Sequence, residues 1–201
     1  MIIVGDIGNT ETKILLINKN NRILKKIHLD TSMINSNTIK KSISTFNIKN
    51  NPIEKILFCS VVPKTFKIIK LILEKKYMLK CYELKNLNLS RLIKIKVNYK
   101  QIGSDRLANA ISIINNKDNF IVLDFGTATT FDVVIKNTYY GGVIAPGVKL
   151  SLETLTKKAT LIPNINLKKI TKVIGSNTIN AVRSGFFWGY AGLIDNIINL
   201  I

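Results

Sequence analysis

The sequence has few of the residues on which metal-binding, disulfide-bonded and thiol-dependent proteins rely. Its only cysteines are Cys59 and Cys81, and its only histidine is His28. None of the three lies at a metal-ligand spacing from another. We therefore expect no zinc site, no Cys/His nucleophile and no disulfide framework in this chain.

Long apolar runs are also missing. No stretch approaches the ~20 consecutive apolar residues that a membrane-spanning helix needs. A strand-like "IIV" follows Met1 directly, where a signal peptide would have a basic start, a long apolar core and a small-residue cleavage site. The sequence predicts a cytoplasmic protein with no membrane partner.

Negative charge is scarce as well, since 12 acidic residues stand against 30 Lys and Arg, which gives a net charge of +18. Such a charge alone would suit nucleic acid or an anionic membrane as partner. The basic residues are scattered along many segments and do not gather in one patch with aromatic residues. We therefore favour a lysine-rich solvated surface over a dedicated nucleic-acid face.

The pattern of apolar residues indicates an α/β fold. Residues 1–7, 12–18 and "NRILKKIHLD" read as three strands of an antiparallel meander. "NTIKKSISTFNI" and "PKTFKIIKLILEKK" have helical spacing, the second with Pro63 near its start, and "IEKILFCSVV" between them reads as a buried strand.

The second half of the chain continues the alternation of helices and strands. In "GSDRLANAISII" either Ser104 or Asp105 can cap a helix, and "NFIVLDFGTATTFDVVI" reads as a strand pair. "TYYGGVIAPGVKL" returns as a strand that leads into a helix near Ser151, and the last helix is interrupted by glycines around Trp188.

One plan occurs twice: an apolar strand, an Asp-x-Gly turn and a second apolar strand, first in "VGDIGNTETK" and again in "LDFGTATT". A duplication on this scale predicts two related domains, which we place at residues 1–118 and 119–201. Two such halves that face each other usually leave a cleft between them.

The two turns have the chemistry of a phosphate-binding loop. Gly8 and Gly126 permit a positive φ, so that successive backbone N–H groups can be exposed, and Asn9, Thr10 and Thr127 add side-chain donors. A single Asp-x-Gly is more typical of an ordinary hairpin turn. Two copies favour phosphate binding.

Charged residues accompany both turns. Asp6 and Asp124 stand at the strand ends, where a carboxylate can hold a hydrated hard cation such as Mg²⁺ beside phosphates. Lys13 can add a positive charge near the phosphates. No Gly-x-x-x-x-Gly-Lys-[Ser/Thr] occurs, so a Walker-type ATPase is not supported.

The segment "IGSDR" suggests a second kind of chemistry. Asp105 could accept a hydroxyl proton while Arg106 binds a carboxylate through its two-pronged guanidinium group. The choice of Arg is notable in a chain that uses Lys almost everywhere. The alternative, that Asp105 only caps a helix and Arg106 is a surface residue, remains open from the residues alone.

Six motifs together resemble one known family, the type III pantothenate kinases of the acetate and sugar kinase, Hsp70 and actin superfamily. They run in family order and cover nearly the whole chain: "DIGNTETK", "SVVP", "GSDRLAN", "DFGTATTFD", "GGVIAPG" and "NTINAVRSGFFWGYAGLID". The resemblance implies duplicated actin-like (ribonuclease H-like) domains with a nucleotide cleft between them, and usually a homodimer.

The resemblance also implies transfer of the γ-phosphoryl group of ATP to pantothenate, the first step of coenzyme A biosynthesis. Asp105 would be the general base, Asp6 would hold Mg²⁺, and Asp124 would bind a monovalent cation, K⁺ or NH₄⁺. The residues implied for ATP are Asp6, Ile7, Gly8, Asn9, Thr10, Glu11, Thr12, Lys13 and Thr127. Those implied for pantothenate are Tyr99, Gly103, Ser104, Asp105, Arg106 and Thr178.

Some alternatives to these roles stay open. Without the family, Tyr99 reads as a half-buried aromatic at a strand end and Thr178 as a helix N-cap. Family members continue for several tens of residues beyond the "GYAGLID" helix, so the second domain is expected to lack its closing strand and helix. This supports one alternative to an active kinase, an inactive shortened relative or partner subunit. The net charge supports another, a nucleic-acid-binding protein.

Overall fold

The computed structural model describes residues 1–46 and 52–201, which divide into two compact units. Unit 1 comprises Met1–Phe120 and Val134–Gly141, and unit 2 comprises Ile121–Val133 and Gly142–Ile201. The end of the predicted helical segment "NTIKKSISTFNI" lies outside the described residues. The predicted domain limits at residues 118 and 119 stay a prediction.

Unit 1 is built on a five-stranded sheet with the strand order β3-β2-β1-β4-β5. Its strands are β1 (Ile2–Ile7), β2 (Glu11–Ile17), β3 (Ile23–Asp30), β4 (Lys55–Ser60) and β5 (Cys81–Glu83). β1 pairs antiparallel with β2 and parallel with β4, and β2 pairs antiparallel with β3. The predicted antiparallel meander is therefore confirmed, and it leads into a parallel extension.

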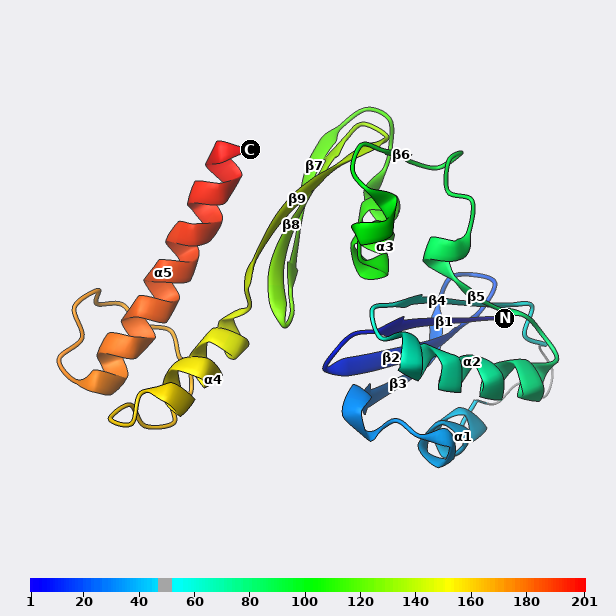
Figure 1. Ribbon diagram of the computed structural model, residues 1–201, viewed down its shortest axis with the longest axis horizontal. Coiled ribbons are helices and arrows are strands. Elements are labelled where there is room, and N and C mark those ends of the chain that lie inside the picture. The colour runs from blue at the N-terminus through cyan, green and yellow to red at the C-terminus, as the bar shows by residue number, and fades with distance from the viewer. Residues whose placement is uncertain (47–51) are drawn as a thin grey trace. The chain divides into compact units, whose positions relative to one another are not determined.

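Two helices, α1 (Ser36–Ser44) and α2 (Pro63–Tyr77), lie beneath this sheet in Figure 1. Asn35 starts α1 with a capping box that includes Thr38, and Pro63 occupies the first turn of α2, where its missing N–H costs no helical hydrogen bond.

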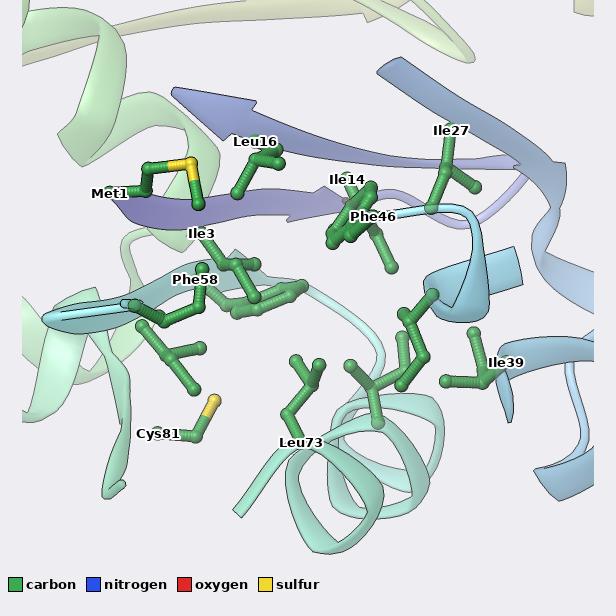
Figure 2. Close-up of a cluster of buried hydrophobic side chains, with 14 of the residues drawn as sticks. Met1, Ile3, Ile14, Leu16, Ile27, Ile39, Phe46, Phe58, Leu73 and Cys81 are labelled. Atoms are coloured by element: carbon green, nitrogen blue, oxygen red, sulfur yellow. The ribbon is translucent and has the colours of Figure 1, made fainter. Parts of the chain in front are cut away.

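The main core of unit 1 lies between the sheet and these helices. Figure 2 shows side chains from strands and helices packed together there, among them Ile3, Ile14, Phe58 and Leu73. Along β2 every second residue is buried, as the period of a strand requires, so one face of β2 contributes to this core.

A second cluster in unit 1 surrounds α3 (Ser104–Ile113). Leu107 and Ala110 of α3 are buried against Val134 and Tyr139, together with Ile102. The chain reaches α3 through the 3-10 helix η2 (Leu84–Asn86), the short strand β6 (Lys94–Ile95) and the 3-10 helix η3 (Tyr99–Gln101).

The remaining elements are β7 (Asn119–Phe125), β8 (Ala128–Ile135), β9 (Thr138–Pro146), α4 (Val148–Lys158) and α5 (Thr178–Leu200). The second sheet has the order β6-β9-β8-β7. The fold is thus the α/β class that the sequence predicts, with two sheets. No helix in the described ranges is both long and apolar enough to cross a membrane.

Two predicted helix caps are wrong. The N-cap of α3 is Gly103, in place of Ser104 or Asp105, because the Ser104 hydroxyl is donated to Glu83 and the Gly103 backbone is extended at the helix start. The N-cap of α5 is Asn177, whose side-chain oxygen accepts a hydrogen bond from the Asn180 N–H, and Thr178 is the first helical residue.

The predicted use of positive φ in the two Asp-x-Gly turns is also wrong. Among the glycines of residues 1–46 and 52–201, only Gly141 has a positive φ. The Gly8 N–H bonds to the Glu11 carbonyl oxygen at 2.9 Å, whereas the Gly126 N–H bonds to the Ala128 carbonyl oxygen at 2.9 Å. Both turns therefore close without left-handed glycine, and the second turn is one residue tighter.

Candidate active site

The first hairpin presents a polar tip on a buried base. Asn9 and Thr10 are exposed at the tip, between the end of β1 and the start of β2. The side chains of Ile7 and Thr12 are fully buried. Of the residues predicted to bind ATP, these two can therefore offer only their backbone groups to a ligand at this surface.

Charges on the hairpin pair with each other. The Glu11 Oε2 lies 3.6 Å from the Lys13 Nζ and 3.0 Å from the His28 Nε2. The hydrogen bond with His28 lowers the pKa of Glu11, and the charges of His28 and Lys13 act in the same direction. Glu11 is thus kept ionised beside the predicted phosphate site, and the two basic groups that flank it offset its negative charge.

Asp6 and Asp105 both act on one thiol. The single S–H proton of Cys59 has two acceptors within reach, the Asp6 Oδ1 at 3.4 Å from the sulfur and the Gly5 carbonyl oxygen at 3.7 Å. Burial raises the pKa of Cys59, and the negative charges of Asp6 and Asp105 raise it further. The predicted magnesium ligand thus contacts Cys59 directly, and the charge of the predicted general base acts on the same thiol.

These surroundings predict that the thiols are unreactive in the folded protein. Burial raises the pKa of Cys81 to about 12, and the pKa of Cys59 is raised as well. A thiol with a pKa near 12 is only about one part in 10⁴ thiolate at pH 8. We expect iodoacetamide to modify both cysteines about 10³-fold more slowly in native protein than in urea. Rapid labelling of either one in native protein would contradict this.

A pocket of about 300 Å³ opens in unit 1 next to Asp6, Lys13 and Cys59. The rest of its lining is apolar and consists of Val4, Gly5, Leu15, Leu57, Phe58, Leu84 and Ala108. Such a pocket can take an apolar part of a ligand whose polar end meets the carboxylate.

The segment that leads to Asp105 is held by a neighbouring lysine. The Tyr99 hydroxyl donates to the Lys85 carbonyl oxygen at 2.6 Å, and the Lys85 Nζ donates to the carbonyl oxygens of Lys100 at 2.8 Å and Ile102 at 2.6 Å. Tyr99 is half-buried on the α3 cluster. These contacts fix the path of the chain immediately before the predicted base.

The first turn of α3 holds Asp105 in place through hydrogen bonds. The buried Ser104 donates its hydroxyl to the Glu83 Oε1, and the Asp105 Oδ1 accepts the Arg106 backbone N–H at 2.8 Å. A Cβ atom on Gly103 would lie 2.4 Å from the Asp105 Oδ1. Glycine is thus needed at position 103 because a side chain would displace the carboxylate.

In unit 2, the second hairpin exposes Asp124 and Thr127. The Gly147 N–H donates to the Thr127 carbonyl oxygen at 3.0 Å, so the start of α4 supports this turn. Thr130 donates to the buried Asp132 at 3.4 Å. Asp124 and Thr127 are therefore accessible to a cation and to ATP, while Asp132 lies in the interior.

Thr178 also lies in unit 2, exposed at the start of α5. Later in this helix Phe186 stacks on Tyr190, with the ring centroids 5.9 Å apart, and the Trp188 ring contacts Phe187 edge-on at 5.1 Å.

The carboxylates of the site suit a magnesium ion that is bound together with a nucleotide better than a metal ion whose ligands all come from the protein. The described part of the chain contains no group of three or more His, Cys, Asp or Glu that could hold a metal ion. Mg²⁺ bound to a nucleotide commonly uses only one or two carboxylates together with phosphates. Asp6 at the end of β1 is consistent with that mode.

Sequence reasoning missed several residues that shape the site, namely Thr31, Cys59, Glu83 and Lys85. None of them forms a recognisable motif with its neighbours in the chain. Each acts through a contact with a residue far away in sequence, such as the bond from Cys59 to Asp6. Only the fold reveals such contacts.

Comparison with known proteins gives a consistent result. A family model described as type III pantothenate kinase matches residues 2–200. A type III pantothenate kinase of Pelagibacter ubique (strain HTCC1062) is 72% identical over the whole of this chain, which covers 81% of that protein. Another, from Sulfurihydrogenibium sp. (strain YO3AOP1), is 35% identical over the whole chain and 82% of its own length.

One solved structure shares the fold at low sequence identity. A crystal structure of a Baf family protein from Campylobacter jejuni aligns with 97% of this chain and 78% of its own, with a TM-score of 0.55 and 22% identity. At that identity the likeness concerns the fold alone.

Proposed function

The chain belongs to the type III pantothenate kinase family, and we propose that Asp105, Asp6 and the hairpin of residues 8–13 carry its reaction. Members of the family transfer the γ-phosphoryl group of ATP to pantothenate, which gives 4'-phosphopantothenate for coenzyme A biosynthesis. The observation that supports these residues most is that Asp6 contacts Cys59 directly, while the negative charge of Asp105 acts on the same thiol.

In the proposed reaction Asp105 accepts the proton of the primary hydroxyl of pantothenate. The hydroxyl oxygen forms a bond to the γ-phosphorus, the bond from that phosphorus to the β–γ bridging oxygen breaks, and ADP leaves with the electron pair. Phosphoryl transfer depends mainly on positioning and charge stabilisation. The fixed first turn of α3 supplies the positioning of the base.

The hairpin is proposed to bind ATP. The exposed tip at Asn9 and Thr10 offers donors to phosphate oxygens, and Thr127 of the second hairpin is assigned to ATP as well. Asp6 would hold Mg²⁺, which when bound neutralises the negative charge of the phosphates. Asp124 is assigned to a monovalent cation, K⁺ or NH₄⁺.

Pantothenate is assigned to the segment before and at the start of α3, to Tyr99 and to Thr178. Arg106 would bind the carboxylate of pantothenate, because its planar group can donate two parallel hydrogen bonds. The Ser104 hydroxyl is already donated to Glu83, so we assign Ser104 a role through its backbone.

A homodimer formed through α5 is part of the proposal. Cβ atoms on Gly185, Gly189 and Gly192 would meet nothing within 4 Å outside their own helix, and these positions recur on one face. Trp188 is 41% exposed. We also place the protein in the cytoplasm, since both cysteines are free thiols.

The two alternatives receive less support. Only the net charge of +18 supports a nucleic-acid-binding protein. Family membership favours neither that function nor an inactive relative.

Purified protein with ATP, Mg²⁺, K⁺ and pantothenate is expected to form phosphopantothenate, detected by mass spectrometry, together with an equal amount of ADP. Omission of pantothenate should abolish ADP formation, and exchange of K⁺ for Na⁺ should lower the rate. A folded protein that forms no product would contradict the proposal and favour the inactive relative.

A further inference from the structure

We propose that Thr31 is a positioning residue that holds the hairpin of residues 8–13 in the conformation that binds ATP. Thr31 lies outside every motif of the sequence. It begins the 3-10 helix η1 (Thr31–Met33), directly after β3. The inference rests on the assignment of this hairpin to ATP under the proposed function.

Thr31 reaches the hairpin with its backbone and its side chain. Its N–H donates to the Thr10 carbonyl oxygen at 2.9 Å. Its hydroxyl donates to the Gly8 carbonyl oxygen at 2.8 Å, and its Oγ1 lies 2.9 Å from the Thr12 Oγ1. One residue thus contacts both sides of the turn.

The direction of these bonds follows from the number of protons. A threonine hydroxyl has a single proton, and that of Thr31 is donated to Gly8. The Thr12 hydroxyl must therefore donate to the Thr31 Oγ1. Thr12 is fully buried and Thr31 is 7% exposed, so the hydrogen bonds from the Thr12 hydroxyl to the Thr31 hydroxyl and on to the Gly8 carbonyl oxygen are sheltered from water.

Thr31 is itself held in place. The Asp30 Oδ1 accepts hydrogen bonds from the Ser32 N–H at 2.9 Å and the Ser32 hydroxyl at 2.7 Å. These bonds lower the pKa of Asp30. The turn after β3 is therefore a defined structure, and it gives the hairpin a fixed point of attachment.

This arrangement explains why a buried Thr12 stands within a phosphate-binding motif. Its hydroxyl faces the interior and supports the turn, while Asn9 and Thr10 face outward. Binding donors that are already in position avoid the cost of ordering a loop when the ligand binds. Loss of the Thr31 hydroxyl should therefore weaken ATP binding without removing any group that contacts ATP.

The test compares Thr31→Val with Thr31→Ser. Valine keeps the shape but leaves the Gly8 carbonyl and the Thr12 hydroxyl without their partner, whereas serine keeps the hydroxyl. We expect Thr31→Val to raise the Kd for ATP, measured by calorimetry, about tenfold, which corresponds to roughly one net hydrogen bond. Amide hydrogen exchange of residues 8–12 should become faster in the protein without nucleotide. Thr31→Ser should restore both.

A control separates this effect from a general loss of stability. Ile69→Val shortens a fully buried side chain in α2, and we expect it to leave the Kd for ATP within twofold of wild type. A Thr31→Val protein that binds ATP like wild type would overturn the inference. Wild-type protein that binds ATP but does not phosphorylate pantothenate would overturn the proposed function. The role of Thr31 would still be decided by the Kd values for ATP of wild type, Thr31→Val and Thr31→Ser.

Discussion

Replacement of Asp105 by Asn is expected to lower turnover about 10²- to 10⁴-fold while ATP binding is retained. The amide keeps an oxygen that can accept the Arg106 N–H, a bond that the Asp105 Oδ1 accepts at 2.8 Å. The start of α3 should therefore be preserved. The amide cannot take the proton of the pantothenate hydroxyl, so the loss should appear in kcat.

Asp118→Asn is the matched control for this variant. Asp118 is an exposed aspartate of unit 1 whose Oδ2 accepts a hydrogen bond from the Asn115 side chain at 2.7 Å. The same chemical change at this position should leave kcat unaltered. Wild-type turnover of Asp105→Asn would exclude Asp105 as the base, and a large rise in its Kd for ATP would mean that Asp105 acts in nucleotide binding.

Gly103→Ala tests independently whether the position of the Asp105 carboxylate determines turnover. Its Cβ would lie 2.4 Å from the Asp105 Oδ1, which is an end of a side chain that can move away. We expect this variant to fold and to bind ATP, with a lower kcat because the carboxylate has been displaced.

Local features of the molecule could be predicted from the sequence. The strands of the N-terminal meander follow from short apolar runs around a Gly-Asn turn, and in the structure every second residue of β2 is buried. The helix at Pro63 follows from the preference of proline for the first turn. The positions of Asp6 and Asp105 in their motifs were likewise evident, because the residues around them form recognisable patterns.

The contacts that connect these features could not be predicted. Cys59 reaches Asp6 and Thr31 reaches Gly8 only because separate strands bring them together. The role of glycine could not be predicted for a related reason. The sequence shows that Gly8 and Gly126 permit a positive φ, whereas the structure requires glycine where another group approaches closely, as Asp105 approaches Gly103.

Gly147→Ala, at the N-cap of α4, is expected to destabilise the second hairpin strongly. A Cβ atom here would lie 2.3 Å from the Gly126 carbonyl oxygen and 2.5 Å from the Thr127 carbonyl oxygen. The φ of −72° and ψ of 151° suit any residue, so the obstacle is space. Because the neighbours are backbone atoms, the turn itself must move, and overpacking of this kind costs about 3 kcal/mol.

Gly126→Ala is the matched control, since it makes the same change in the same turn. The nearest atom to its Cβ would be the Ala128 carbonyl oxygen at 3.7 Å, an ordinary contact, and its φ is not positive. We expect its stability to stay within about 1 kcal/mol of wild type. Trp188 is the only tryptophan and lies in α5 of unit 2, so its fluorescence during urea unfolding reports on the unit that contains both glycines. Equal unfolding midpoints for the two variants would show that the start of α4 does not support the turn. The assignment of Thr127 to ATP would then be weakened, because it depends on a rigid backbone at this turn.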